Sequence, residues 1–260
     1  MALLRCALLA SIITTSLTAG IPRAANIIGE VTDIKDLPYN AALLDATSGK
    51  IFCGGSILNA DWILTAAQCI DSLQAADIIV RAGVTDFTDT DGLGQTRSVT
   101  KIVPHDEYDP DGFENDIAVL RLNDSLIFGS NIANVTLDTV RNYDGKTFVA
   151  SGWGWNGPEH KVSKDLRSTN QTYFDHSKCY AIYSDNYDLS ITSKELCAMK
   201  EGFGVCTGDN GGPLYDQSSK TQVGILSFGD PHCSPDIPAV FTMVSVYRDW
   251  VYENIEAPLV

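Results

Sequence analysis

The sequence predicts an all-β fold, and three of its features support this prediction. Short runs rich in Val, Ile and Phe alternate along the 260-residue chain with turn residues, mainly Gly, Asp and Asn. These runs follow one another at nearly regular spacing, which is typical of a β-barrel or a β-sandwich. Hydrophobic residues make up 44% of the chain, which is enough to fill a complete core.

The expected elements follow one another from residue 39 onward. We expect strands over seven short stretches, at residues 52–58, 62–66, 78–82, 117–122, 146–152, 221–228 and 239–243. The last stretch, residues 246–255, has a different pattern, because Val246, Trp250 and Val251 recur at helical spacing. Ser245 is a candidate N-cap. The chain is therefore expected to end in a helix.

The first twenty residues have the pattern of a secretory signal peptide. An apolar run over residues 7–18 follows Arg5, and small residues follow the run. The run is too short to span a bilayer, and no later segment is apolar for long enough. We therefore expect a secreted, extracellular protein with a signal peptide over residues 1–20.

Cysteine usage agrees with secretion. The chain has seven cysteines, and Cys6 lies within the expected signal peptide. The other six allow fifteen pairings, among which sequence alone does not choose. A zinc site is disfavoured, because no C-x-x-C motif or histidine pair stands at ligand spacing. We expect structural disulfides, no metal and no cofactor.

The chain is strongly acidic. It carries 18 Lys and Arg residues against 33 Asp and Glu residues. Removing residues 1–26 takes away Arg5 and Arg23 and no acidic residue, so the net charge changes from −15 to −17. Such a surface excludes nucleic acid as a natural partner. It either attracts basic partners or simply keeps a monomeric extracellular protein soluble.

Three short segments carry the strongest functional signal. They read TAAQC at residues 65–69, DIAV at 116–119 and GDNGGP at 208–213. These segments resemble the catalytic segments of the trypsin-like serine proteases, which read TAAHC, DIAL or DIAV, and GDSGGP. The resemblance covers nearly all of the chain from Ile27. It implies two six-stranded antiparallel Greek-key barrels with a C-terminal helix, and a boundary between the barrels near residues 137–143.

The resemblance places the catalytic base at Gln68, the orienting carboxylate at Asp116 and the nucleophile at Asn210. A Gln carboxamide cannot take up a proton near neutral pH, and Asn has neither a hydroxyl nor a thiol. We therefore expect a degenerate triad and a protein that is not an enzyme and acts by binding. Gly208 and Asn210 remain candidates for an oxyanion hole, although Asn210-Gly211 also fits a simple tight turn.

The resemblance also implies a specificity pocket, formed by Gly204, Val205, Ser227, Phe228, Gly229 and Ala239. Trypsin has an aspartate at the position of Gly204, so this chain offers no anion there to a Lys or Arg side chain. Ala239 replaces a glycine of the family. Its methyl group either narrows the slot or is a neutral substitution in the core.

The resemblance to the family also concerns activation by cleavage before Ile27, for which this chain lacks the usual site. Residues 21–26 resemble a short propeptide, and Ile27 matches the residue whose freed amine pairs with Asp209 in active members. Asn26 precedes Ile27, however, so a trypsin-like activator has no basic residue to recognise. Without that amine, we expect Asp209 to turn outward or to find another donor.

Disulfides and glycosylation sites are the covalent features that we expect. The resemblance implies the disulfides Cys53–Cys69, Cys179–Cys197 and Cys206–Cys233. Three N-x-S/T sequons offer glycosylation acceptors at Asn123, Asn134 and Asn170.

Among serine protease homologues, the chain looks similar to the inactivated serine protease paralogues of parasitic mites, which are relatives of the mite group 3 allergens. This resemblance implies binding to extracellular host proteins and interference with host defence, notably complement or plasma proteases. Two alternatives remain open: a cofactor of an immune proteolytic cascade, and a residual serine endopeptidase.

Overall fold

The computed structural model describes residues 26, 27, 29–89, 92, 94–156, 161–201, 203–205, 208–234 and 236–255. The expected signal peptide, residues 21–25 of the propeptide-like stretch, and Cys206 lie outside the described residues. In the part that is described, no helix has the length and apolar character needed to cross a membrane.

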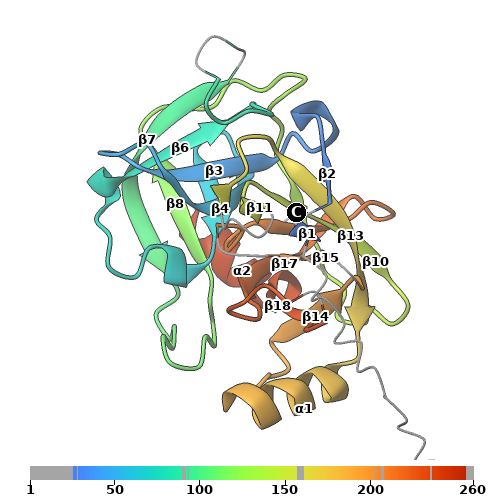
Figure 1. The fold of residues 1–260 in the computed structure, drawn as a ribbon. Coiled ribbons are helices and arrows are strands. Elements are labelled where there is room, and N and C mark those ends of the chain that lie inside the picture. Colours follow the sequence, from blue (N-terminus) through green and yellow to red (C-terminus); the bar gives the residue numbers. More distant parts are fainter. Residues whose placement is uncertain are drawn as a thin grey trace, which may run out of the picture.

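Two closed six-stranded antiparallel barrels form the fold, which confirms the predicted fold class (Figure 1). The first barrel has the order β3-β4-β5-β8-β7-β6 and consists of β3 (Asn40–Asp45), β4 (Ile51–Asn59), β5 (Trp62–Thr65), β6 (Ile78–Ala82), β7 (Gln95–Pro104) and β8 (Ala118–Leu122). The second has the order β10-β16-β17-β18-β14-β13, closed by pairing of β10 with β13, and consists of β10 (Thr147–Gly152), β13 (Arg167–Phe174), β14 (Glu195–Met199), β16 (Pro213–Asp216), β17 (Thr221–Phe228) and β18 (Ala239–Met243).

Short elements attach to this frame. Among the described residues, short strands pair as β1 with β15, β2 with β13, β9 with β17 and β11 with β12, and they span β1 (Asn26–Ile27), β2 (Glu30–Val31), β9 (Thr136–Leu137), β11 (Trp155–Asn156), β12 (Lys161–Val162) and β15 (Phe203–Gly204). The same residues include 3-10 turns at η1 (Ile34–Asp36), η2 (Ala67–Cys69) and η3 (Ala75–Asp77). The connection between the barrels runs from Leu122 to Thr147 and includes residues 137–143.

All seven predicted strands appear with small shifts at their ends, but the helices differ from expectation. The C-terminal helix α2 (Val244–Asn254) begins directly after β18, with Met243 as N-cap and no side-chain cap. Ser245 therefore lies inside the helix, and its predicted capping role is wrong. Buried Val244 draws the first turn of the helix onto the barrel, which outweighs the capping preference of a serine.

Helix α1 (His176–Tyr187) was not predicted, because its amphipathic pattern is weak. Only Cys179 and Tyr183 are buried along its twelve residues. Its N-terminus is capped by Asp175, whose carboxylate accepts from the Lys178 N–H at 3.0 Å. The helix projects from the second barrel at the lower edge of Figure 1.

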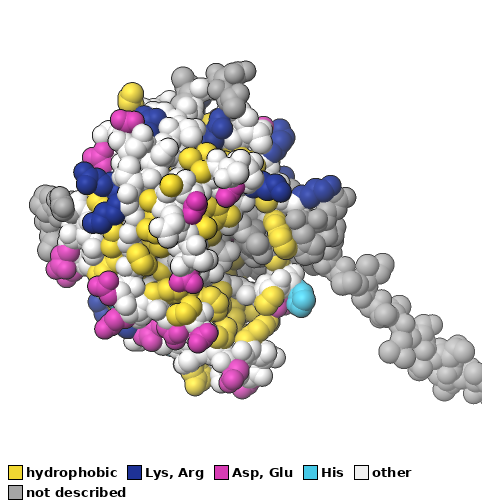
Figure 2. Space-filling model, turned by 90° about the vertical axis from the view of Figure 1, so that its left-hand side faces the viewer, with side chains coloured by type: hydrophobic (Ala, Val, Ile, Leu, Met, Phe, Trp, Pro, Cys, Tyr) yellow, Lys and Arg dark blue, Asp and Glu magenta, His cyan; other side chains and the backbone are white. Residues whose placement is uncertain are grey.

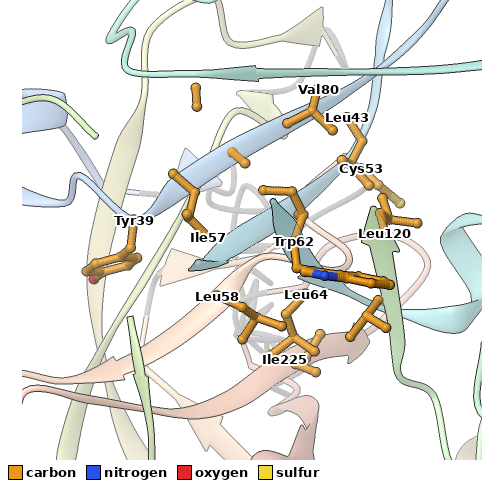
Figure 3. Packing of buried hydrophobic residues seen from close by; sticks show 14 of the residues in the cluster. Tyr39, Leu43, Cys53, Ile57, Leu58, Trp62, Leu64, Val80, Leu120 and Ile225 are labelled. Atoms are coloured by element: carbon orange, nitrogen blue, oxygen red, sulfur yellow. The ribbon is translucent and has the colours of Figure 1, made fainter. Parts of the chain in front are cut away.

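The largest hydrophobic cluster spans both barrels. Figure 3 shows Leu58 and Leu64 of the first barrel near Ile225 of β17 in the second. Ile225 and Leu64 are fully buried. Full burial of such a side chain stabilises the fold by about 1.5–3 kcal/mol. Apolar packing between the barrels thus holds the surfaces that form the cleft.

A buried hydrogen bond also joins the barrels. The Ser56 hydroxyl on β4 donates to Oε1 of Gln222 on β17 at 2.6 Å, and neither residue is exposed. The Gln222 Nε2 donates to the Gly224 carbonyl at 2.9 Å. Both ends of this buried carboxamide are therefore satisfied, one of them from the opposite barrel.

Removing the Ser56 hydroxyl tests this contact. We expect Ser56→Ala to lower the free energy of unfolding by about 1–3 kcal/mol, because the Gln222 oxygen is left buried without a donor. Urea denaturation with the disulfides intact measures the change. Ser98→Ala, on an exposed position of β7, is the control and should change stability by less than about 0.5 kcal/mol. Equal stabilities of the two variants would contradict this account.

Candidate functional site

The three residues at the triad positions lie together where the barrels meet. Gln68 lies in turn η2, immediately after β5, and Asp116 lies two residues before β8. Asn210 belongs to the tight segment that leads into β16 of the second barrel. The disulfide Cys53–Cys69 fixes the turn that carries Gln68 to strand β4. The fold thus brings together three segments that are far apart in the sequence.

The Asp116 carboxylate is fully buried and accepts three hydrogen bonds. Its Oδ1 accepts from the Gln68 backbone N–H at 2.8 Å, and its Oδ2 accepts from Gln68 Nε2 and from the Ser227 hydroxyl, both at 2.6 Å. Burial raises the pKa of Asp116, and the hydrogen bonds from Ser227 and Gln68 act in the opposite direction. The carboxylate is therefore held in place by donors from both barrels.

The Ser227 carbonyl oxygen receives both amide side chains. Gln68 Nε2 donates to it at 2.7 Å, and Asn210 Nδ2 donates to it at 2.5 Å. A carbonyl oxygen has two lone pairs, so these two donors fill its capacity. Gln68 commits both of its amide protons, one to Asp116 and one to Ser227. The amides therefore form a neutral, directional network with no titrating base and no hydroxyl nucleophile.

Asp209 is buried, and it has the alternative donor that the sequence analysis allowed for. Its Oδ1 accepts from the Gly154 backbone N–H at 2.7 Å. The outward turn of this side chain does not occur. The Ile27 backbone pairs in parallel with Gly204, beside the pocket wall.

Backbone donors for an oxyanion remain available next to Asp209. Within the described part of the chain, the backbone N–H groups of Gly208 and Asn210 donate to no protein acceptor. Gly208 has φ +95° and Gly211 has φ +79°, which only glycine adopts readily. The backbone N–H groups on either side of Asp209 thus have no protein acceptor among the described residues, as an oxyanion hole requires.

A pocket of about 110 Å³ opens beside Asn210. Val205, Leu226 and Phe228 form apolar walls, and Gly229 and Asp230 stand along its rim. Gly229, Val205 and the predicted pocket residue Ala239 also line a small inner space of about 10 Å³. Ser227 does not line either space, because its hydroxyl is bound to Asp116. Gly204 is not among the lining residues that the structure describes.

Sequence reasoning missed two polar residues of this pocket. Asp230 lies at the rim, where its Oδ1 accepts from the Tyr187 hydroxyl at 2.6 Å. Gln171, on β13, lines the inner space. The acidic Asp230 directly follows the Ser-Phe-Gly segment and was detectable from that position. Gln171 carries no local signal, because only the pairing of β13 places it there.

The remaining covalent predictions have mixed outcomes. Disulfides join Cys53 to Cys69 and Cys179 to Cys197, and the third expected pair includes Cys206, outside the described residues. The three sequon asparagines have exposed side chains, and their glycosylation stays a prediction. In the described part of the chain, no group of three or more His, Cys, Asp or Glu side chains is arranged to hold a metal ion.

Charge is unevenly spread over the surface of the first barrel. Figure 2 shows acidic side chains gathered along the lower part of this face, with most of the basic ones above them. One acidic loop leads toward the cleft: Asp106, Glu107, Asp109 and Asp111 are exposed, and Phe113 at its end packs on Phe228 of the pocket wall at 5.1 Å between ring centroids.

The sequence of the chain is similar to those of known proteins over most of its length. The sequence model of the family described as Trypsin matches residues 27–251. Trypsin alpha of Drosophila erecta is 34% identical over 224 residues, which is 86% of this chain and 84% of that protein. Hypodermin-B of Hypoderma lineatum is 34% identical over 88% of this chain and 87% of its own length. Trypsin delta of Drosophila melanogaster is 32% identical, with 87% of each chain covered.

These comparisons contradict the prediction that the protein is not an enzyme. The relatives are named as trypsins and as hypodermin-B. That prediction treated the side chains of Gln68 and Asn210 as decisive. In enzymes of this type, removal of a triad member still leaves an acceleration of about 10³–10⁴ over water, which comes from the oxyanion hole and from binding.

A substitution that adds one methyl group beside Asp209 tests whether its carboxylate is buried against Gly154. A Cβ on Gly154 would lie 2.3 Å from the Asp209 carboxyl carbon, whereas a Cβ on Gly229 would meet nothing within 4 Å. We expect Gly154→Ala to lower the free energy of unfolding by about 1–3 kcal/mol through overpacking. Gly229→Ala is the control and should leave stability unchanged in the same urea titration. A stable Gly154→Ala variant would show that Asp209 is not held against this glycine.

Proposed function

Because the chain belongs to the trypsin family, we propose that it binds an extended polypeptide in the cleft between its barrels and hydrolyses it with residual endopeptidase activity. The pocket beside Asn210 carries this proposal. It opens beside Asn210, whose backbone N–H has no protein acceptor among the described residues, and Gly208 lies two residues before it in the chain.

The cleft is suited to binding a peptide main chain. Its pocket combines the apolar residues Val205, Leu226 and Phe228 with the polar residues Asn210 and Asp230, so it can receive one side chain of a peptide. An extended peptide can lie along a cleft while one of its side chains enters a pocket. The Phe113–Phe228 pair adds an apolar surface next to the pocket.

Hydrolysis in this cleft is expected to be slow. Neither Gln68 nor Asn210 can supply a base or a nucleophile, so water must attack the bound peptide directly. Backbone donors that stabilise the developing oxyanion, together with binding, supply about 10³–10⁴ over the uncatalysed rate. The loss of a nucleophile or base costs roughly 10⁶ in turnover in subtilisin, the enzyme in which this was analysed.

Restoring the two lost groups tests the proposal. We expect Gln68→His with Asn210→Ser to raise peptide hydrolysis by at least about 10², because general base catalysis alone contributes about 10²–10⁴. The rate should stay far below that of an ordinary trypsin on Arg substrates, because Gly204 stands at the sequence position where trypsin has an aspartate. Mass spectrometry of a peptide mixture gives the initial rate of hydrolysis for the natural protein and for the double variant.

A fluorophosphonate probe provides the control for contaminating proteases. It should label the repaired variant and neither label nor inhibit the natural protein, since that protein has no serine at position 210. Hydrolysis by the natural protein that equals the rate in buffer would contradict residual activity. If none of the peptides in the mixture binds, the proposed function as a whole is contradicted.

The biological setting that we propose is extracellular. The signal-like segment over residues 7–18 and the disulfides support it. The similarity to the serine protease paralogues of parasitic mites, stated in the sequence analysis, supports a partner among host plasma or complement proteins. The net charge of −15 favours a basic partner surface.

Capture from host plasma tests this setting. The full-length secreted protein should retain a basic plasma protein, and its association rate should fall as salt rises from low to physiological concentration. Surface-based binding kinetics at several salt concentrations measure this. A retained partner whose association rate does not change with salt would show that the acidic surface serves solubility alone.

A further inference from the structure

Gln171 presents an unusual buried group behind the pocket. It lies on β13 and is 1% exposed. Its Nε2 is buried and has no hydrogen-bond partner in the described part of the chain. A buried polar group without a partner costs about 1–3 kcal/mol, so such groups in native proteins are normally satisfied by protein, water or ligand. This amide therefore indicates a missing acceptor.

The position of Gln171 connects it to the peptide-binding pocket. It lines the inner space of about 10 Å³, and the outer pocket has about 110 Å³. Val205 and Gly229 line both spaces, so the inner space lies directly behind the outer one. A side chain that enters the outer pocket past Gly229 thus points its end toward Gln171.

Charge complementarity restricts what the pocket can hold. A cationic side chain would find the Asp230 carboxylate in the outer pocket alone, and its end would meet the positive end of the Gln171 amide dipole in the inner space. An anionic side chain would pass Asp230, and no Lys or Arg is among the described residues that line either space. A buried charge without a counter-charge is strongly disfavoured. The end of the occupant that reaches the inner space is therefore neutral.

The size of the inner space sets the length of the occupant. Ala239 lines this space and leaves room on the order of one water molecule. The terminal group of the occupant must therefore reach Gln171 from the outer pocket, directly or through one water. A short side chain with a terminal carbonyl oxygen satisfies both the volume and the unpaired donor.

We propose that Gln171 is a specificity-determining residue of the cleft and selects a peptide whose pocket side chain is short, uncharged and ends in a hydrogen-bond acceptor, as the carboxamide of Asn does. This inference rests on the proposed peptide-binding function and names the substrate class of that site. A pocket built around a hydrogen bond rejects an isostere that lacks it, because the buried group is then left unpaired.

Four labelled peptides that differ only at the pocket position test the inference. The position carries Asn, Leu, Asp or Lys, where Leu has nearly the shape of Asn without its polar atoms. Fluorescence anisotropy with the full chain gives each Kd. We expect the Asn peptide to bind about tenfold or more tightly than the Leu peptide, which corresponds to about 1.4 kcal/mol. The Asp and Lys peptides should bind more weakly than the Asn peptide.

Two variants assign the preference to Gln171. In Gln171→Met, which keeps the length of the side chain without its donor, the preference for Asn over Leu should disappear. In Gln171→Glu, which keeps the shape, the preference should shift toward the Lys peptide. Gln217→Met, at an exposed position between β16 and β17, is the matched control and should keep the preference.

The outcomes separate this inference from the function on which it rests. If the peptides bind with the same Asn-to-Leu ratio in the natural protein and in Gln171→Met, the role of Gln171 is refuted and peptide binding stands. A natural protein that prefers the Lys or Asp peptide also refutes it. If none of the four peptides binds, the peptide-binding proposal and this inference fall together.

Discussion

The buried carboxylate of Asp116 is the group on which the arrangement of the cleft depends. Removal of a carboxylate from water is costly, and three donors offset this cost. Two of the donors come from Gln68 in the first barrel, and the third is Ser227 of β17 in the second. The same interactions that satisfy the charge therefore fix the two barrels relative to each other at the cleft.

Both substitutions at the triad positions fit this electrostatic requirement. A carboxamide at position 68 donates to Asp116 and to the Ser227 carbonyl at once, and the carboxamide of Asn210 donates to the same carbonyl. The result is a cleft floor without a titrating base. Its polar groups are mutually satisfied, while the adjacent backbone donors and the pocket remain open.

Much of the fold followed from the sequence, because strand patterns and turn residues are local. Helix α1 could not be predicted in this way, since it buries only Cys179 and Tyr183. The start of α2 was misplaced because Ser245 looked like a cap, whereas packing of Val244 decides the boundary. In the site, the motifs located Gln68, Asp116 and Asn210, but Gln171 reaches the pocket only through strand pairing, which no local pattern shows. The expectation of a non-enzyme rested on the side chains of Gln68 and Asn210, and the relatives that are named as trypsins contradict it.

The central claim is that the side-chain amides of Gln68 and Asn210 are locked onto Asp116 and the Ser227 carbonyl. Hydrogen exchange of side-chain amides, followed by NMR on the nitrogen-15-labelled protein, tests this most directly. The account predicts that the Gln68 and Asn210 amide protons exchange much more slowly than those of exposed Gln217. Exchange of Gln68 and Asn210 at the rate of Gln217 would show that the network does not hold in solution and would contradict the account.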